Sequence, residues 1–383
     1  MPTKQNTPPP RRPDGRSRPH PEAGDRRRPD GRNRQRKKKS KVGRIILFTV
    51  EIVALVLVTM FLYTTLKVEK SGRLNIAEES IIINQTVREH HAQEAMKGFR
   101  TVALFGVDST TGQLAKNTRT DTIMIASINL DNGEVRLVSV YRDTYLNLGN
   151  DRYNKANAAY ANGGPEQAIN MLNMNMDLNI TDFVTVGFKG LVDTIDALGG
   201  IMIDVTEAEI VHLNNYQATM AKELKRDSFP VRNAGRQRLD GLQATAYCRI
   251  RFTAGDDFRR AERNREVLRQ ILDEAKKASP ATISKIATDV FGSVLTSFDL
   301  ADIISLLGDI TKYKIVDDAG FPTEALRTTG TIGNAGSCVV PIDLTANVIW
   351  LHQFLFGFDE YTPSNELKTY SDKIKKDTSP FLR

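Results

Sequence analysis

The sequence predicts an α/β fold in which helices flank a mixed central sheet, preceded by a single N-terminal transmembrane helix. Three observations predict it. Residues 45–66 form an apolar run of about 22 residues, long enough to span a bilayer. Residues 120–145 contain two apolar, β-branched runs around an Asn-Leu-Asp-Asn-Gly turn, which predicts a hairpin. Residues 181–205 follow a strand, helix, strand pattern that is typical of α/β domains.

The first 44 residues are strongly basic. They carry sixteen Lys and Arg against four acids, a net charge of about +12, and the whole chain carries +7, so the rest is mildly acidic at about −5. This segment is rich in Pro and Gly and has too few apolar residues to bury a core, which predicts disorder. Such a tail binds nucleic acid or another partner, or it rests on anionic lipid beside a membrane span. The span that follows favours lipid, and no nucleic-acid partner is expected.

The apolar run is expected to be an uncleaved anchor. Five Lys and Arg lie just before it, and the charged Lys67-Val68-Glu69-Lys70 follows instead of a small-residue cleavage site. The tail should therefore stay in the cytoplasm, with everything after residue 66 outside the cell behind a single-pass cell-membrane anchor. The expected organisation is a disordered tail at 1–44, a transmembrane helix at 45–66, a linker or stalk at 67–97, a main domain at 98–277, and an extension packed on that domain at 278–383.

Charged side chains gather at the ends of the predicted strands. The strand at 99–109 ends beside Asp108, where α/β sheets place ligands. Arg119 and Asp121 open the hairpin's first strand, and Arg142 and Asp143 close its second. In an antiparallel hairpin those ends lie side by side, so arginines and carboxylates should meet at one edge. These charged groups could form salt bridges at the rim of the sheet, each worth about 0–1 kcal/mol. The alternative is a binding site in which the carboxylates, together with phosphate oxygens of a ligand, hold Mg²⁺.

The segment between the hairpin and the second charged cluster is expected to be mostly helical. A short helix from residue 153 should stop at Gly163-Gly164, and a second should begin at Pro165. A strand at 181–187, an amphipathic helix at 188–198 and a strand at 201–205 then follow.

The second charged cluster spans residues 247–267. Arg249 and Arg251 are two residues apart, so on a strand they share a face. Asp257, Arg260 and Asn264 stack on one face of a helix at 257–275, with Arg263 beside them. A solvated helix face would also alternate charges, but this helix has an apolar face to pack on the sheet. Gathering six arginines in one domain requires a multiply charged anion, and guanidinium groups suit phosphate. The six are Arg119, Arg142, Arg249, Arg251, Arg260 and Arg263.

Several motifs together resemble one known family. They are Phe-Gly-Val-Asp at 105–108, Arg-Thr-Asp-Thr at 119–122, Val-Tyr-Arg-Asp-Thr at 140–144, Asn-Lys-Ala-Asn-Ala-Ala-Tyr at 154–160, the segment ending in Gly-Gly at 192–200, Leu-Asp-Gly-Leu-Gln-Ala at 239–244, and the cluster at 249–264. In this order they resemble the LytR-CpsA-Psr family over about residues 98–275.

The resemblance implies an extracellular phosphotransferase that depends on Mg²⁺ (or Mn²⁺). Its donor would be a polyprenyl-pyrophosphate-linked glycopolymer, such as teichoic acid or a capsular or wall polysaccharide, and its acceptor peptidoglycan. Asp108 and Asp121 match the family's metal-site acids. Five arginines match its pyrophosphate-binding residues, and Arg263 and Asn264 are added as further candidate contacts. The five are Arg119, Arg142, Arg249, Arg251 and Arg260. The family usually has Gln in place of Asn264 and often Pro in place of Tyr141.

The expected mechanism follows from charge. A peptidoglycan hydroxyl attacks the phosphorus next to the glycan, and polyprenyl phosphate leaves while the arginines and the metal neutralise the developing charge. Asp143 or Asp257 accepts the proton or orients an arginine. A slot for the lipid is expected along the helix that bears Ala156, Ala158 and Ala159, together with Leu191, Ile195 and Leu198; plain core packing is the alternative for each of these residues. Two alternatives stay open, a non-catalytic scaffold or regulator that binds lipid-linked glycan, and a hydrolase that uses water.

The last hundred residues contain more helix and strand patterns, at 281–295, 300–312, 313–317, 337–341 and 344–356, and a polar end expected to be loose. Cys248 and Cys338 are the two cysteines of the chain. An even pair outside the membrane suggests a disulfide, which would fix the extension beside Arg249; the alternative is two free buried thiols.

Overall fold

The computed structural model describes residues 72–89, 96–109, 114–115, 118–251, 256–289 and 291–382. The predicted tail and transmembrane helix at 1–66 lie outside the described residues. Within the described ranges, no helix is both long and apolar enough to cross a bilayer.

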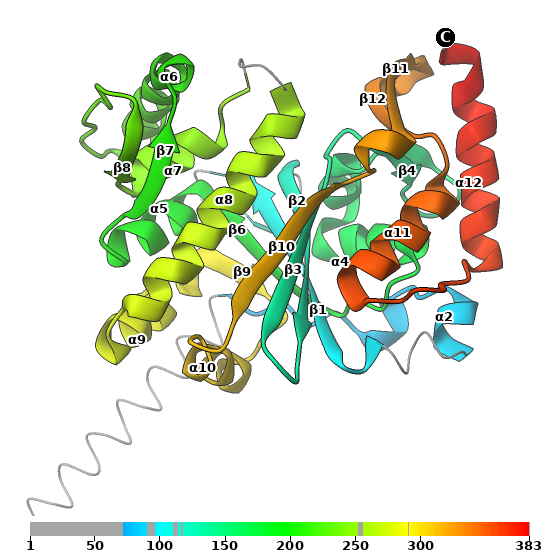
Figure 1. Ribbon diagram of the computed structural model, residues 1–383, viewed down its shortest axis with the longest axis horizontal. Helices are drawn as coiled ribbons and strands as arrows, with labels where there is room; N and C mark the ends of the chain where they lie inside the picture. Colours follow the sequence, from blue (N-terminus) through cyan, green and yellow to red (C-terminus); the bar gives the residue numbers. More distant parts are fainter. Residues whose placement is uncertain are drawn as a thin grey trace, which may run out of the picture. The chain divides into compact units, whose positions relative to one another are not determined.

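A six-stranded mixed sheet forms the centre, in the order β10-β3-β2-β1-β6-β9 (Figure 1). The strands are β1 (Phe99–Val107), β2 (Thr120–Asn129), β3 (Glu134–Val140), β6 (Asp182–Gly187), β9 (Val294–Thr296) and β10 (Lys314–Phe321). β2 pairs antiparallel with both of its neighbours, β1 and β3, whereas β6 pairs parallel with β1 and β10 pairs parallel with β3. The mixed sheet and the hairpin are therefore as predicted. Gly133 has a φ of +74° at the turn, a conformation that side chains disfavour.

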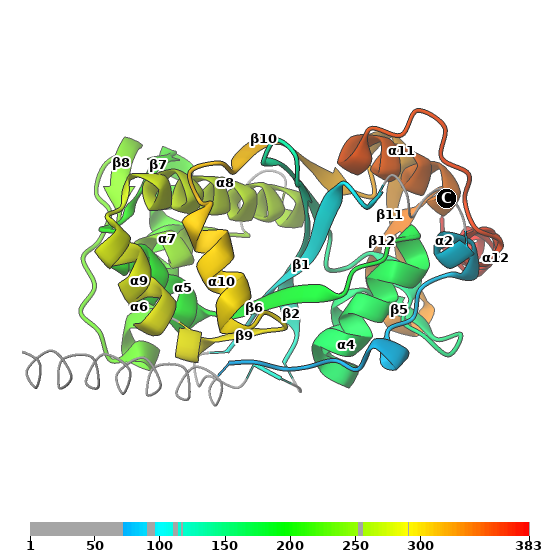
Figure 2. The same ribbon diagram turned by 90° about the horizontal axis from the view of Figure 1, so that it is seen from below.

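Helices cover both faces of this sheet (Figure 2). On one face, α4 and α11 pack against β1, β2 and β3 in the main apolar core, which also includes part of α12. The other side holds a second core built from α5, α6, α7, α8 and a two-stranded antiparallel sheet of β7 and β8. These elements are α4 (Asn157–Met176), α5 (Phe188–Ala197), β7 (Ile201–Val205), α6 (Glu207–Leu224), β8 (Gly235–Leu239), α7 (Gly241–Cys248), α8 (Asp256–Lys277), α11 (Leu344–Phe356) and α12 (Asn365–Thr378).

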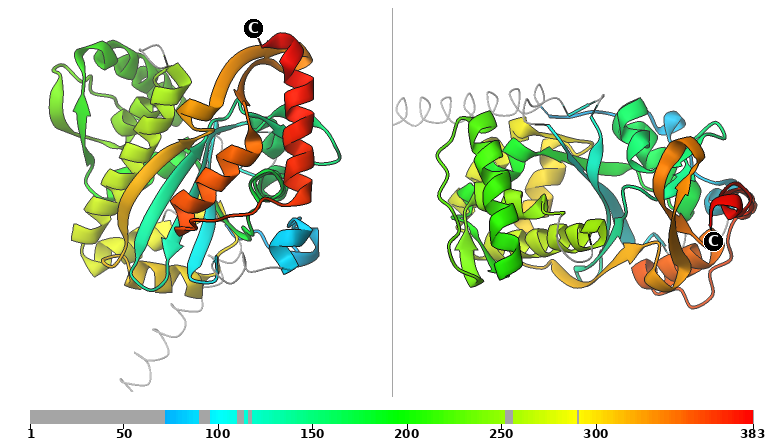
Figure 3. Two further views of the ribbon diagram at one scale, coloured as in Figure 1. Left: turned by 45° about the vertical axis from the view of Figure 1, so that its right-hand side comes forward. Right: turned by 90° about the horizontal axis from the view of Figure 1, so that it is seen from above.

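The C-terminal residues are part of the sheet. β10 supplies one edge strand and β9 the other, so the segment from 278 onward is woven into the domain where an added extension was expected (Figure 3). The polar end is ordered as well, because Leu367 and Ile374 of α12 are fully buried. The other elements here are α9 (Pro280–Asp289), η2 (Phe291–Ser293), α10 (Leu300–Gly308), η3 (Glu324–Leu326), β11 (Arg327–Ile332), η4 (Gly333–Ala335), β12 (Gly336–Pro341) and η5 (Ser379–Phe381).

Two local expectations were wrong. The helix expected from residue 153 begins only at Asn157, because Tyr153–Lys155 forms β5, which pairs with β4 (Tyr145–Asn147). The described part of the expected stalk packs on the domain: η1 (Glu78–Ser80) and α2 (Gln85–Glu89) lie there, and the amide of Ile82 donates to Asn170 of α4 at 2.8 Å. The kink of α4 at Gly164 agrees with the predicted break.

Candidate active site

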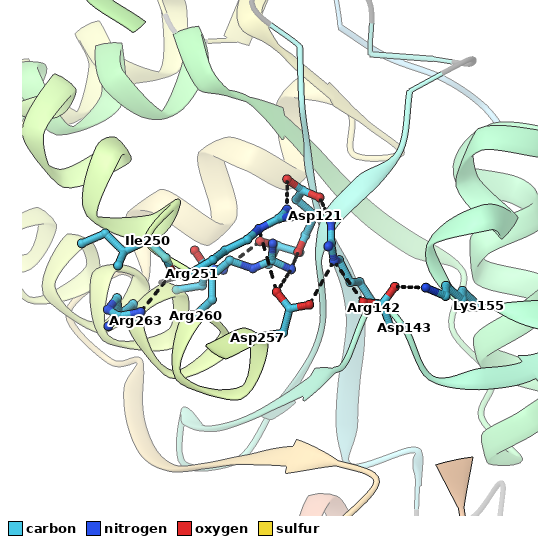
Figure 4. A network of polar contacts seen from close by, with 11 residues as sticks. Asp121, Arg142, Asp143, Lys155, Ile250, Arg251, Asp257, Arg260 and Arg263 are labelled. Carbon is cyan, nitrogen blue, oxygen red and sulfur yellow. Dashed lines mark hydrogen bonds and ion pairs between the residues drawn. The ribbon is translucent and has the colours of Figure 1, made fainter. Parts of the chain in front are cut away.

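A β-bulge places Asp121 at the centre of the charged cluster. Gly106 pairs with Thr122 and Val107 with Thr120, so Asp121 is the extra residue of β2. A bulge re-aims a side chain that would otherwise follow the strand's alternation. Arg142 Nη1 donates to Asp121 Oδ1 at 2.8 Å, and Arg251 Nη2 donates to Asp121 Oδ2 at 3.2 Å (Figure 4). One carboxylate therefore orients two arginines from distant parts of the chain.

Asp257, near the start of α8, is the second carboxylate of the cluster. Its oxygens lie 3.3 Å from Arg260 Nη2, 3.5 Å from Arg142 Nε and 3.9 Å from Arg251 Nε. Burial alone would raise the pKa of Asp257, but Arg260, Arg142 and Arg251 outweigh it and lower the pKa below its usual value. Asp257 is therefore ionised at neutral pH and links the three arginines.

The paired groups of the cluster leave one positive charge in excess. Arg142, Arg251, Arg260 and Lys155 face three carboxylates, those of Asp121, Asp143 and Asp257. Arg260 is nearly buried, and this burial lowers its pKa from the usual guanidinium value, although an arginine remains charged at neutral pH. Its Nη1 has no hydrogen-bond partner in the described part of the chain. A buried guanidinium with a spare donor is suited to an anionic ligand.

Arg249 lies beside this cluster. It is the C-cap of α7, and its guanidinium stacks over Phe188 at 4.4 Å and Tyr216 at 5.3 Å from the ring centroids. Its Nη1 is buried and has no hydrogen-bond partner among the described residues. The N-cap of α7 is Asp240, which accepts from Gln243 in a capping box, so the Leu-Asp-Gly-Leu-Gln-Ala motif sets where this helix starts.

Asp143 and Lys155 lie on the opposite side of Arg142 from Arg251 and Arg260 (Figure 4). Arg142 Nε is 3.5 Å from Asp143 Oδ2, and Lys155 Nζ is 3.3 Å from Asp143 Oδ1. Burial opposes the charge on Arg142, but Asp257, Asp121 and Asp143 outweigh it and raise its pKa. Lys155, in the motif at 154–160, was not singled out from the sequence, because its partner is fixed only by β4 pairing with β5.

The remaining predicted residues are placed as follows. Arg119 is exposed at the start of β2, and its carbonyl oxygen accepts from the amide of Asp108 at 3.5 Å. Asp108 is exposed at the end of β1 and faces the same cavity as Asp121. Asn264 donates to the Thr122 hydroxyl at 3.0 Å and also lines that cavity.

The prediction for Arg263 was wrong. Its side chain is 1% exposed, its Nε is 2.9 Å from Glu209 Oε1, and its Nη1 donates to the carbonyl of Ile250 at 3.0 Å. Residues three apart on a helix differ in direction by about 60°, which is enough to turn Arg263 away from Arg260 into the core. The charge of Arg263 is therefore paired with Glu209 in the core and does not face the site.

The two cysteines are free, contrary to the disulfide prediction. Cys248 ends α7 in the core that α5 to α8 share, whereas Cys338 lies in β12 in the core on the other face of the sheet. Burial raises the pKa of Cys248 to about 12 and that of Cys338 to about 11, so both remain unreactive thiols. Arg249 and Arg251 were expected on a strand, but helix α7 continues to Cys248 and Arg249 is its C-cap.

An apolar cavity of about 430 Å³ opens at the charged cluster. It lies between β1, β2 and β6 of the sheet and helices α5, α7 and α8. The charged residues Asp108, Asp121, Arg249, Arg251 and Arg260 line part of it. The apolar lining includes Leu104, Met124, Val184, Val186, Leu191, Leu268 and Ile271. Of the residues expected to line a lipid slot, Leu191 lines this cavity, whereas Ala156, Ala159 and Ile195 are fully buried in the two cores.

Asp108 and Asp121 could hold a divalent metal only if a bound ligand and water supplied the other coordinating oxygens. The described residues contain no group of three His, Cys, Asp or Glu that would hold a metal by themselves. Asp108 and Asp121 follow paired positions of β1 and β2 and line one cavity. Mg²⁺ is typically held by one or two carboxylates, with water and phosphate oxygens completing its shell, so this pair is compatible with it.

We compared the chain with known proteins to find which family it resembles. The LytR_cpsA_psr family model matches residues 59–346. A relative from Oceanobacillus iheyensis, named polyisoprenyl-teichoic acid–peptidoglycan teichoic acid transferase TagU, is 29% identical over 233 residues, which cover 59% of this chain and 65% of that protein. The match thus spans just under two thirds of the relative.

Two solved structures share the fold. One, described as TagT bound to LIIa-WTA, has a TM-score of 0.56 and 21% identity and covers 74% of this chain and 100% of its own. The other, TagT with bound octaprenyl pyrophosphate lipid, has a TM-score of 0.53 at the same identity and coverage. With a family model that matches three quarters of its residues, the chain belongs to the LytR_cpsA_psr family.

Proposed function

We propose that this protein is a transferase that moves a glycopolymer from a polyprenyl pyrophosphate carrier to peptidoglycan. The observation that carries the proposal is the apolar cavity of about 430 Å³ with Arg249, Arg251 and Arg260 in its wall. This combination matches an amphiphile with a diphosphate head and an apolar tail. Support also comes from relatives that are named teichoic acid transferases and from a fold neighbour that holds octaprenyl pyrophosphate.

The proposed location follows from the sequence. The apolar run at 45–66 would anchor the protein once in the cell membrane, with the basic tail in the cytoplasm and the catalytic domain outside. The lipid carrier would then reach the cavity from the outer leaflet, and the peptidoglycan acceptor would approach from the wall.

The proposed chemistry is a displacement at phosphorus. The oxygen of a peptidoglycan hydroxyl forms a bond to the phosphorus next to the glycan, and the bond from that phosphorus to the bridging oxygen breaks. Polyprenyl phosphate leaves with the electron pair. Arg142, Arg251 and Arg260, already oriented by Asp121 and Asp257, neutralise the charge that develops on the phosphoryl oxygens.

The two carboxylates that the sequence left as alternative proton acceptors differ in the structure. Asp257 contacts three arginines and has a lowered pKa, which makes it a weak base and suits it to orienting those arginines. Asp143 contacts Arg142 and Lys155 on the side of Arg142 that lies away from Arg251 and Arg260 (Figure 4). Asp143 is therefore the better-placed acceptor of the hydroxyl proton. Mg²⁺ or Mn²⁺ held by Asp108 and Asp121 would add positive charge at the diphosphate.

Arg251→Ala should weaken binding of octaprenyl pyrophosphate by about 10–100-fold, because it removes charge-assisted hydrogen bonds worth about 1.5–3 kcal/mol. Arg251 is the best variant of the cluster for this test, since its side chain is 31% exposed and its loss leaves no cavity in a core. Arg232→Ala, at an exposed arginine after α6, is the control. Equilibrium binding of octaprenyl pyrophosphate to the full-length protein in nanodiscs measures the effect, and equal affinity in both variants would contradict the proposed site.

Leu191→Trp should distinguish long lipids from short ones. The indole ring would fill part of the apolar cavity that Leu191 lines, and displacing about two methylene groups costs roughly tenfold in affinity. Octaprenyl pyrophosphate should therefore bind about tenfold more weakly, whereas geranyl pyrophosphate should bind almost as it does to the wild type. Leu130→Trp, at the exposed hairpin turn, is the control. A uniform loss for both lipids would mean that the cavity does not hold the tail.

A further inference from the structure

A second pocket lies on the other side of the charged cluster from the apolar cavity. It has a volume of about 340 Å³ and is formed by β4, β5, η4, the end of α12 and η5. A pocket of this size is within the usual range for small-molecule sites, roughly 300–1,000 Å³. We call it the tyrosine pocket after Tyr145 and Tyr153, whose ring centroids lie 6.1 Å apart.

The lining of the tyrosine pocket suits a neutral polar molecule. Asn154 and Asn334 are exposed amides, and Asp377 adds a carboxylate whose charge is balanced by Lys373 at 2.6 Å. None of the described residues that line this pocket is an arginine, in contrast to the apolar cavity. Sugar rings present apolar C–H faces and a rim of hydroxyl groups. Aromatic rings pack against such faces, and amide and carboxylate groups bind such hydroxyls.

The tyrosine pocket connects to the charged cluster through a short stretch of chain. Tyr145 follows Asp143 by two residues, a distance of about 7 Å along an extended strand. Lys155, which pairs with Tyr145 in the β4–β5 register, has its amine 3.3 Å from Asp143. The amide of Val339 in β12 donates to the Asp143 carbonyl at 2.9 Å, which fixes this stretch from the other side. A sugar in the pocket would therefore bring a hydroxyl group near Asp143.

The other side of Asp143 faces the donor site. Arg142 lies between Asp143 and the Arg251–Arg260 pair (Figure 4). The order across the molecule is thus the apolar cavity, the arginine cluster, Asp143 and the tyrosine pocket. In a displacement at phosphorus the attacking and leaving oxygens lie roughly in line on opposite sides. This order puts the acceptor where an in-line attack requires it.

We infer that the tyrosine pocket is the acceptor subsite and binds a neutral sugar unit of a glycan strand beside Asp143. This inference rests on the proposed transferase function, because it assigns the second substrate of the same reaction. It takes a carbohydrate rather than a second phosphate, since the two lysines beside the pocket, Lys155 and Lys373, are already paired with Asp143 and Asp377.

The test uses the full-length protein in nanodiscs with a polyprenyl-pyrophosphate-linked disaccharide as donor and soluble, uncross-linked peptidoglycan strands as acceptor. Asn154→Ala changes an exposed side chain and should not disturb folding, and Tyr153→Ala removes an aromatic wall. Tyr313→Ala, at a partly exposed tyrosine just before β10, is the matched control. Rates at varied strand concentration give the acceptor KM, and octaprenyl pyrophosphate binding reports on the donor site.

Tyr153→Ala should raise the acceptor KM about tenfold and Asn154→Ala about three- to tenfold, as expected for losing ground-state contacts. Tyr313→Ala should stay near the wild-type KM, and all three variants should bind octaprenyl pyrophosphate like the wild type. A wild-type acceptor KM in both pocket variants overturns the subsite while leaving the transferase intact. A wild-type protein that binds octaprenyl pyrophosphate but transfers nothing to the strands overturns both the subsite and the transferase function.

Direct binding of the strands, without donor, should weaken in the same two variants. Equal binding of the strands to Asn154→Ala and to the wild type would also overturn the subsite.

Discussion

Asp121→Asn should lower kcat/KM for glycopolymer transfer by about 10³-fold or more, which is at or above the usual cost of losing one preorganised electrostatic group. The substitution keeps the size of the side chain and removes its charge. Arg142 and Arg251 lose the carboxylate that orients both of them, and the proposed metal site loses one ligand. Steady-state rates with the lipid-linked disaccharide donor and soluble peptidoglycan strands measure the effect.

Asp131→Asn is the matched control, because Asp131 is exposed at the hairpin turn, at the opposite end of β2 from Asp121. It should transfer at the wild-type rate. The melting temperature of Asp121→Asn should stay close to that of the wild type, since its ion pairs are partly solvated and contribute little to folding. Transfer by Asp121→Asn within threefold of the wild type would show that the cluster is not the active site.

Arg263→Met should destabilise the fold by about 3–5 kcal/mol, because it leaves the carboxylate of Glu209 buried without its partner. Both side chains are almost fully buried, at 1% and 3% exposure. Denaturant unfolding at pH 7 measures the loss. Arg259→Met, which breaks a solvated pair with Glu262 in the same helix, should cost less than about 1 kcal/mol.

The double variant Arg263→Met/Glu209→Gln should recover part of this loss, since it removes the orphaned charge and keeps the side chain's shape. Burial raises the pKa of Glu209, but hydrogen bonds from Thr206 and Arg263 outweigh it, so its folded pKa lies below the usual value. The wild type should therefore keep this stabilisation above the ordinary glutamate pKa and lose it as the pH falls through the folded one. A destabilisation of Arg263→Met that is small at pH 7 would contradict the buried ion pair.

Much of the fold is local enough to be predicted from the sequence. The hairpin follows from alternating apolar runs around Gly133, and the break in α4 follows from Gly164 and Pro165, because these signals act within a few residues. The convergence of Asp121 with Arg142 was predictable for a similar reason, since antiparallel pairing brings the ends of a hairpin together. The charge pattern also indicated correctly that Arg251 and Arg260 join them.

Other features depend on contacts between distant segments. Whether a helical arginine faces the site or the core is decided by a rotation of a few tens of degrees, so Arg260 and Arg263 could not be separated by spacing alone. The edge strand β10 joins β3 from about 180 residues away, and the two cysteines are placed in cores on different faces of the sheet. The bulge at Asp121 arises from the register of β1 and β2 and has no signature in the residues themselves.

The sequence by itself determined the charged groups, the sheet and the family resemblance, because residue type and short-range periodicity encode them. Tertiary structure alone decided which arginines can reach a ligand, where the apolar cavity lies, and that the tyrosine pocket lies on the far side of Asp143. The physical reason is that burial and pairing change the role of a charged group, and both depend on neighbours that are far away in the chain.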